Sequence, residues 1–314
     1  PWEANEAERH GARGIGLLRT EFLVVGRAAL PSEEEQYEAY RHVAQTFPDA
    51  AVMIRTFDVG GDKFPTFLHM PREENPYLGW RAIRVCLDQP ELFRPQLRAL
   101  LRATAHGDVR IMLPLVNDVD EVLKVRSLLK EEEDRLSSDG LAFNPGYKLG
   151  LLIETPAAAL DAVELARHAD FFSIGTNDLV QYTLAVDRNN TRLANLFNPF
   201  HPAVVRQLHQ VSRVARAAGI EVSVCGEMAA NPLGAFLLLG LDIHSLSVAW
   251  PSLPEIKKVI REFRIEDARK AAAGALAAPT SKEVVARLEE GAGSTIDLSA
   301  FSGRWSLNVP QPGG

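Results

Sequence analysis

Short apolar runs alternate with longer amphipathic stretches over most of the chain, and this alternation narrows the folds open to it. The apolar runs lie at residues 14–19, 51–57, 109–116, 148–154, 171–175, 221–225 and 245–248. Several are apolar on both faces, which is typical of parallel strands buried between helices. The stretches at 32–47, 89–105, 119–136, 156–168, 202–218 and 232–241 have helical spacing. We therefore expect an α/β fold with a parallel sheet.

The number of strand–helix units favours a barrel. Seven clear strands and a weak eighth at 80–85, spread over roughly 250 residues, predict a (β/α)8 TIM barrel. A doubly wound open sheet produces a similar alternation and remains an alternative. We expect one barrel domain over residues 1–270. A C-terminal tail over 271–314 is expected to be helical at first, with 265–278 and 281–290 in helices, and irregular from 291 onward.

Composition excludes several classes of protein. The chain has 314 residues, 46% of them apolar and 24% charged, so it can bury a full core. Its formal charge of −7 gives no footprint for nucleic acid. Two cysteines imply no disulfide framework and favour the cytoplasm. No apolar run approaches the roughly 18 residues of a membrane span. The first residues lack a Met or a signal-peptide pattern, so we expect a fragment of a longer protein.

Two carboxylates close apolar runs, Glu154 at the end of 148–154 and Asp178 at the end of 171–178. They are 24 residues apart, about one strand–helix–strand unit. Parallel strands joined by a crossover helix end at the same edge of a sheet, which is the edge where α/β barrels keep their chemistry. Two carboxylates supplemented by water and substrate oxygens are a usual way to hold Mg²⁺. We therefore predict a magnesium site formed by Glu154 and Asp178.

Four arginines occupy positions suited to binding a multiply charged anion: Arg19, Arg55, Arg81 and Arg188. A single arginine at a strand end is most often a salt-bridge partner. Four at the edge that carries two carboxylates are harder to explain in that way. Guanidinium groups match phosphate and carboxylate oxygens in a bidentate geometry. The combination predicts a phosphorylated carboxylic acid bound together with Mg²⁺.

Three more residues are candidates at this edge. Lys63, on a Gly-Gly turn after the second strand, could add a positive charge for a phosphate. Residues 176–179 are expected to open a helix or turn, whose N–H groups and Asn177 amide would face an anion. Cys225 ends the sixth strand and precedes Gly226, and a thiol that stays protonated could donate a proton to carbon. The other cysteine, Cys86, is interpreted as a buried apolar residue, and the eight histidines as surface or capping residues.

Taken together, these residues resemble the C-terminal, phosphoenolpyruvate-binding domain of enzyme I of the bacterial phosphoenolpyruvate:sugar phosphotransferase system. The resemblance is collinear from about residue 5 to about residue 270. It is carried by GIGLLRTEFL at 14–23, LPSEEEQ at 30–36, RTFDVGGDK at 55–63, EENPYLGWRAIR at 73–84, IETPAA at 153–158, GTNDLVQY at 175–182, AVDR at 185–188 and CGEMA at 225–229.

The resemblance implies a (β/α)8 barrel that forms a homodimer and acts as part of a transferase. Mg²⁺ would be the cofactor, with Glu154 and Asp178 as its ligands. Phosphoenolpyruvate would be held by Arg19, Arg55 and Arg188, with help from Lys63, Arg81, Asn177 and Asp178. Cys225 would exchange a proton with the methylene carbon. The phosphoryl group would pass to a His on a preceding domain, absent from this chain, and then to a small His-containing phosphocarrier protein.

The chain departs from the family pattern at three places. Asn189 replaces a Gly beside Arg188, and Ala230-Asn231 replaces Gly-Asp after the Cys225 motif. Both changes leave the expected ligands in place and should at most tune affinity. The phosphohistidine and carrier-binding domains are missing, so we expect that this chain alone cannot complete phosphoryl transfer.

Two other interpretations compete with this one. One is the phosphoenolpyruvate domain of a pyruvate, phosphate dikinase or phosphoenolpyruvate synthase, which shares the barrel and the Cys. GGDK at 60–63 and NPYLGWR at 75–81 favour enzyme I over these enzymes. The other is a dimeric module that senses phosphoenolpyruvate without turnover, against which the intact set of ligands argues.

Overall fold

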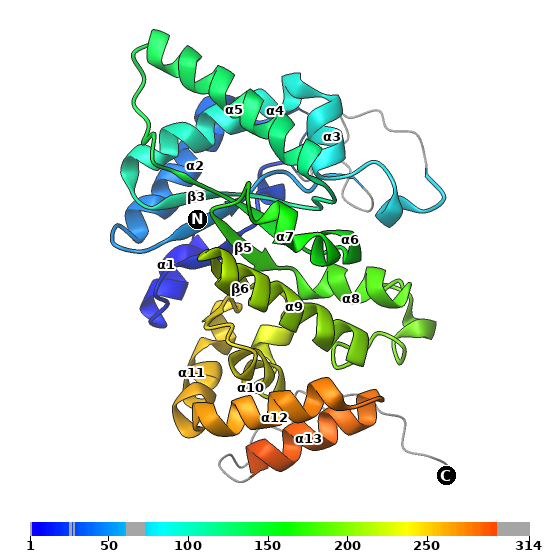
Figure 1. The fold of residues 1–314 in the computed structure, drawn as a ribbon. Helices are drawn as coiled ribbons and strands as arrows, with labels where there is room; N and C mark the ends of the chain where they lie inside the picture. Colours follow the sequence, from blue (N-terminus) through cyan, green and yellow to red (C-terminus); the bar gives the residue numbers. More distant parts are fainter. Residues whose placement is uncertain (1, 25–26, 28, 61–72, 294–314) are drawn as a thin grey trace. The chain divides into compact units, whose positions relative to one another are not determined.

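The computed structural model describes residues 2–24, 27, 29–60 and 73–293. Seven strands follow one another in chain order within this part of the protein, in one sheet ordered β1 to β7 (Figure 1). They are β1 (Ile15–Leu18), β2 (Val52–Arg55), β3 (Val109–Leu113), β4 (Lys148–Ile153), β5 (Phe171–Ile174), β6 (Glu221–Val224) and β7 (Ser245–Leu246). Each lies within a run predicted as a strand. The order is that of a TIM-barrel-type α/β fold, so the predicted fold class is confirmed.

The weak eighth strand predicted at 80–85 is wrong. Arg81 makes an isolated antiparallel bridge with Gly60, and a helix, α3 (Ile83–Asp88), begins two residues later. Ile83, Val85 and Cys86 are fully buried, so the apolar pattern that suggested a strand reflects the buried face of this helix. A short apolar run cannot be assigned to helix or strand by periodicity alone.

The chain divides into two compact units. Unit 1 comprises residues 1–153 and 164–172, and unit 2 comprises 154–163 and 173–314. The helices assigned wholly to unit 1 are α1 (Trp2–Arg9), α2 (Glu33–Thr46), α3, α4 (Pro90–Ala103) and α5 (Val119–Ser138). Those assigned wholly to unit 2 are α6 (Pro156–Leu160), α8 (Thr176–Leu184), α9 (Pro202–Ala218), α10 (Pro232–Gly240), α11 (Leu253–Glu262), α12 (Ile265–Ala277) and α13 (Ser281–Gly293). A short helix α7 (Ala162–Leu165) lies where the assignment changes.

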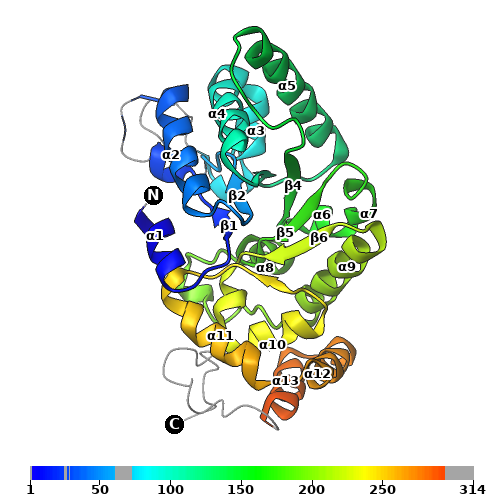
Figure 2. The ribbon, with the colours of Figure 1, turned by 90° about the vertical axis from the view of Figure 1, so that its left-hand side faces the viewer.

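In unit 1 the strands β1 to β4 pair in parallel, with Val52 opposite Val109 and Ile111 opposite Leu149. Gly150 on β4 leaves room for the ring of Phe171, because a Cβ there would lie 2.2 Å from the ring. Helix α4 packs against both α2 and α5 (Figure 2). Ser32 begins α2 with a capping box that includes Glu35, which satisfies N–H groups at the helix start.

In unit 2 the strands β6 and β7 are parallel, with Ser223 opposite Ser245. Helices α12 and α13 lie side by side in both views, and α12 packs on α10 (Figures 1 and 2). Gly240 allows this contact, because a Cβ there would lie 2.2 Å from the carbonyl oxygen of Ala268. The helical C-terminal region was predicted. Position 270, the expected domain boundary, lies within α12.

Among the described residues, no helix combines the length and the apolar character that crossing a membrane requires.

Candidate active site

The start of helix α8 brings the two predicted metal ligands together in unit 2. Glu154 follows β4 directly, and Asp178 is the third residue of α8. A Cβ on Gly175, the residue before α8, would lie 2.6 Å from Glu154 Oε2, so the Glu154 carboxylate packs against the start of this helix. Both carboxylates are buried, at 2% and 5% exposure. Sequence spacing placed these acids at one strand edge, and the structure puts both at the start of one helix.

Two carboxylates at this helix start could supply part of the ligand shell of a cation that keeps water or substrate oxygens as its other ligands. Within the described residues, no three His, Cys, Asp or Glu side chains gather into a metal-binding group. Mg²⁺ commonly takes only one or two carboxylates and fills its remaining positions with water and substrate oxygens. Glu154 and Asp178 therefore offer a suitable partial shell.

Cys225 and Asn177 lie at the same helix start. The Cys225 N–H donates to the carbonyl oxygen of Ile174 at 3.1 Å, and the Cys225 Sγ lies 3.8 Å from the same oxygen. Asn177 Oδ1 accepts the N–H of Glu227 at 3.0 Å. This bond orients the Asn177 amide, because it leaves the amide NH₂ on the side away from Glu227. The thiol is half-buried, unlike that of Cys86.

Arg188 reaches back toward Asp178 from the turn after α8. Its Nη2 lies 3.7 Å from Asp178 Oδ1, and its backbone N–H donates to Gln181 Oε1 at 3.1 Å. The Arg188 side chain is 29% exposed. Arg188 therefore carries a positive charge beside the carboxylates while remaining accessible.

Buried polar groups without hydrogen bonds concentrate in the same segment. Ser173 Oγ, Thr176 Oγ1 and Gln181 Nε2 are buried and have no hydrogen-bond partner within the described part of the chain. Such groups are nearly always satisfied in folded proteins, by water or ligand if not by protein. Sequence analysis did not identify these three residues. Their only sequence signal is their position around Asn177 and Asp178.

In unit 1, the three predicted arginines differ in their surroundings. Arg55 is the last residue of β2 and Arg81 follows the turn at 79–80, and each is only 4% exposed. Arg55 Nη2 donates to Glu21 Oε1 at 2.9 Å, and Arg81 makes a bidentate pair with Asp58. Arg19, directly after β1, is exposed. The predicted ligand Lys63 lies outside the described residues.

The acids that pair with these arginines were overlooked in the sequence analysis. Glu21 stands two residues after Arg19, and Asp58 stands three residues after Arg55. Both lie inside segments that carry the family resemblance. Only the Arg55–Asp58 pair has a local sequence signal, because Asp58 stands three residues after Arg55, whereas Glu21 pairs with an arginine 34 residues away.

The two departures near the site have simple local roles. Asn231 caps α10 by accepting the Gly234 N–H at 3.0 Å, a bond that an Asp would also make. The N–H of Asn189 donates to Asp187 Oδ1 at 2.8 Å in the turn that carries Arg188. Both residues support the backbone near predicted ligands.

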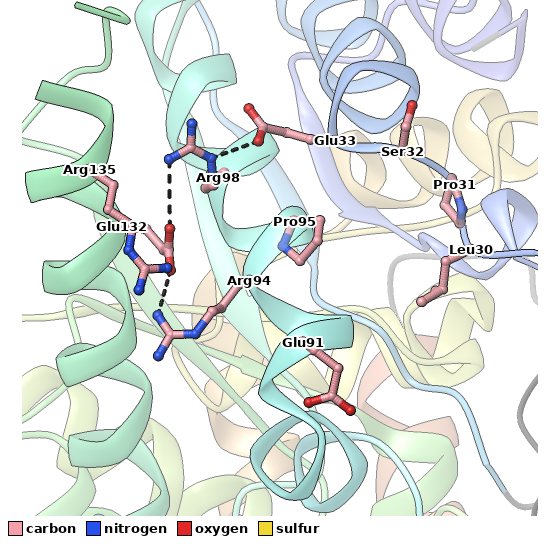
Figure 3. A pocket seen from close by; sticks show the side chains of 10 residues that line it. All are labelled: Leu30, Pro31, Ser32, Glu33, Glu91, Arg94, Pro95, Arg98, Glu132 and Arg135. Carbon is pink, nitrogen blue, oxygen red and sulfur yellow. Dashed lines mark hydrogen bonds and ion pairs between the residues drawn. The ribbon is translucent and has the colours of Figure 1, made fainter. Parts of the chain in front are cut away.

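A separate depression of about 620 Å³ lies on unit 1, lined by α2, α4 and α5 (Figure 3). Arg94, Arg98 and Arg135 surround the fully buried Glu132, and Arg98 also pairs with Glu33 at 2.7 Å. None of the predicted ligands lines it. Ion pairs of Glu132 with Arg94, Arg98 and Arg135, and of Arg98 with Glu33, connect the three helices.

The chain combines a sheet ordered β1 to β7 with buried carboxylates and an arginine near the start of α8. These features define a TIM-barrel-type domain with acidic and cationic groups at strand ends. Residues 1–265 match the family model described as PEP-utilising enzyme, PEP-binding domain, and the chain belongs to this family.

Three curated relatives with the same description match this chain over most of its length. A phosphoenolpyruvate-protein phosphotransferase of Haemophilus influenzae is 44% identical over 288 residues, which cover 92% of this chain and 50% of the relative. The proteins of that description from Buchnera aphidicola and Staphylococcus carnosus are 42% and 44% identical over 91% and 90% of this chain. They are covered to 50% and 49% of their own lengths. The chain thus spans about half the length of the curated relatives it matches.

Proposed function

We propose that this chain is the phosphoenolpyruvate-binding and dimerisation domain of a cytoplasmic phosphoenolpyruvate-protein phosphotransferase. The observation that carries the proposal is the arrangement at α8, where Glu154, Asp178, Asn177 and Cys225 meet. The relatives are phosphoenolpyruvate-protein phosphotransferases, which supports this reaction over that of a dikinase or synthase. In the longer protein, the phosphoryl group would pass to a His on another domain and then to a small phosphocarrier protein.

Each group has a role that its chemistry suits. Glu154 and Asp178 would hold Mg²⁺, which supplies positive charge for the phosphate and carboxylate oxygens of phosphoenolpyruvate. Arg19, Arg55 and Arg188 would bind those two anionic groups, with Lys63, Arg81 and Asn177 as additional donors. Phosphoryl transfer depends mainly on such positioning and charge stabilisation.

Cys225 would complete the reaction. When the His takes the phosphoryl group, the leaving group is the enolate of pyruvate. The Cys225 thiol would then donate its proton to the methylene carbon, which yields pyruvate and a thiolate. Formation of the keto product draws the transfer forward. In the reverse direction, the thiolate would remove a proton from the methyl group of pyruvate.

The first test replaces Glu154 with Gln, which removes the negative charge and keeps the size. We expect calorimetric affinity for phosphoenolpyruvate in the presence of Mg²⁺ to fall by about a hundredfold, because one charge-stabilising group is lost. Glu266→Gln on the exposed face of α12 is the control and should leave the affinity unchanged. Unchanged affinity in the Glu154 variant would refute the metal assignment.

The second test replaces Cys225 with Ala. Phosphoenolpyruvate binding should be retained, because the thiol acts on carbon after phosphoryl transfer. Deuterium exchange at the methyl carbon of pyruvate, followed by NMR in a longer chain that carries the phosphohistidine domain, should slow by about 10²-fold or more. Cys86→Ala is the matched control, since Cys86 is buried and should not affect exchange. Full exchange without the Cys225 thiol would remove this residue from the mechanism.

A further inference from the structure

Four buried charges form a connected network in unit 1. Glu21 Oε1 accepts from Arg55 Nη2 at 2.9 Å and from the backbone N–H of Asp58 at 3.1 Å. Asp58 Oδ2 lies 3.1 Å from Arg55 Nη1, and both Asp58 oxygens accept from Arg81 Nη2 at 2.9 Å. The four side chains are only 1% to 8% exposed. One oxygen of Glu21 thus connects the Arg55 guanidinium to the backbone that carries Asp58.

The backbone around this network is also fixed. Thr20 Oγ1 donates to the Arg55 carbonyl at 3.0 Å, and Gln96 Oε1 accepts the Phe57 N–H at 2.9 Å. The Ala82 N–H donates to the Val59 carbonyl at 2.9 Å. Hydrogen bonds therefore hold both the backbone and the carboxylates around Arg55 and Arg81 in place. An arginine side chain that is not held in this way loses rotamer entropy when it binds a ligand.

We propose that Glu21 is a positioning residue for substrate binding, which holds the Arg55 guanidinium in a fixed orientation and, through Asp58, does the same for Arg81. This inference rests on the proposed function, in which both arginines bind phosphoenolpyruvate. The two acids also neutralise the two arginines.

The test compares Glu21→Gln with Glu132→Gln. Glu132 is also a buried acid of unit 1 bound by arginines, but it lines the depression described above, which none of the predicted ligands lines. Glu21→Gln is expected to weaken calorimetric phosphoenolpyruvate affinity about tenfold or more, since it replaces a charge-assisted hydrogen bond by a neutral one. Glu132→Gln should lower the melting temperature and leave affinity within about twofold of the unchanged chain.

A second measurement reports on positioning directly. In ¹⁵N NMR spectra, a held guanidinium gives separate Nη–H signals, and a rotating one gives broadened signals. The Arg55 signals should broaden in Glu21→Gln and stay sharp in Glu132→Gln. If Glu21→Gln does not fold, Asp58→Asn takes its place in the test. This variant leaves the Glu21–Arg55 bond in place and should broaden the Arg81 signals more than the Arg55 signals.

The outcomes separate this proposal from the proposed function. Sharp Arg55 signals together with unchanged affinity in Glu21→Gln would overturn the positioning role. An equal loss of affinity in Glu21→Gln and Glu132→Gln would also overturn it, because general destabilisation would then explain both. If the unchanged chain fails to bind phosphoenolpyruvate, the proposed function fails, while the NMR comparison still decides whether Glu21 orients Arg55.

Discussion

At the scale of single residues, the geometry of the site depends on two glycines, which allow close contacts because they have no side chain. A Cβ on Gly226 would lie 1.9 Å from Thr176 Oγ1 and 2.7 Å from the Thr176 backbone nitrogen. The turn after Cys225 therefore approaches the start of α8 closely because residue 226 is glycine. Gly175 leaves space for the Glu154 carboxylate in the same way.

Gly175→Ala should disable the metal site while keeping the fold. Gly175 has φ −86°, which any residue adopts, so the expected effect comes from contact and not from backbone strain. The new Cβ would lie 2.6 Å from Glu154 Oε2 and 2.8 Å from Glu154 Cβ, which displaces the carboxylate. Titration with Mn²⁺, followed by electron paramagnetic resonance, should show affinity reduced by about tenfold or more.

The control is Gly293→Ala at the end of α13, where no atom of the described residues lies within 4 Å of the new Cβ. It should bind Mn²⁺ like the unchanged chain. If Gly175→Ala binds Mn²⁺ as tightly as the unchanged chain, metal binding does not require the present position of the Glu154 carboxylate.

At the scale of elements, a buried polar network ties helices α2 and α4 to the ends of β1 and β2 in unit 1. Gln96 on α4 accepts from the Phe57 N–H and donates to Thr20 Oγ1 and to the Tyr40 hydroxyl. Burial raises the pKa of Tyr40, the hydrogen bond with Gln96 lowers it, and the Glu21 charge raises it further, so the hydroxyl stays neutral. Strand ends that carry predicted ligands are thus linked to the helices behind them.

Gln96→Leu should destabilise the protein by about 2–3 kcal/mol, because it leaves the buried Phe57 N–H without its partner and removes one hydrogen bond each from the Thr20 and Tyr40 hydroxyls. Urea unfolding measures this change directly. Glu91→Gln on the exposed side of the same helix should stay within about 0.5 kcal/mol of the unchanged chain. A Gln96 variant as stable as the control would mean that water replaces the lost bonds.

Sequence patterns predicted most elements because the relevant forces are local. Helix α9 begins at Pro202, as its first-turn proline indicated, and His201 caps it by accepting the Ala203 N–H. Helix α11 was missed, although Pro254 and the buried Ile256 and Val259 have helical spacing. The single helix predicted at 156–168 is two short ones, α6 and α7, because the first ends at Asp161.

The candidate site was only partly predictable. Spacing indicated Glu154 and Asp178, because both follow strand ends that any parallel sheet brings to one edge. The pairing of Arg55 with Glu21 joins residues 34 positions apart through the folded backbone, and composition cannot reveal that. The orphaned Ser173, Thr176 and Gln181 likewise depend on burial, which follows from tertiary packing.

At the scale of the whole molecule, single acids connect distant elements of one unit. Asp242, before β7, accepts from Arg216 on α9 and from Arg269 on α12. Burial alone raises the pKa of Asp242, but hydrogen bonds and charge from Arg269 and Arg216 outweigh it and lower the pKa below its ordinary value of 3.8. Two histidines also lie near this carboxylate: His244 Nε2 is 4.0 Å from Asp242 Oδ1, and the charge of Asp242 acts on His209.

Asp242→Asn should therefore destabilise the protein in a pH-dependent way. A carboxyl group with a lowered folded-state pKa contributes stability above its unfolded pKa and loses it as pH falls through the folded pKa. The difference in unfolding free energy between Asp242→Asn and the unchanged chain should be about 1 kcal/mol at pH 7. It should shrink once the pH falls below 3.8, as denaturant titrations at several pH values would show.

Asp139→Asn in unit 1 is the comparison, since Asp139 is 54% exposed and pairs with Arg98 at 2.9 Å. It should change stability little at any pH. A difference for Asp242→Asn that is the same at pH 3 and pH 7 would contradict the linkage.

The contrast between the two cysteines has a practical consequence. Cys86 is fully buried and burial raises its pKa, so it resists thiol reagents, whereas Cys225 is half-buried and bonds to the carbonyl oxygen of Ile174 at the end of β5. A maleimide dye would react with the sulfur of Cys225, so no additional cysteine would have to be introduced. Its fluorescence would follow ligand arrival in real time.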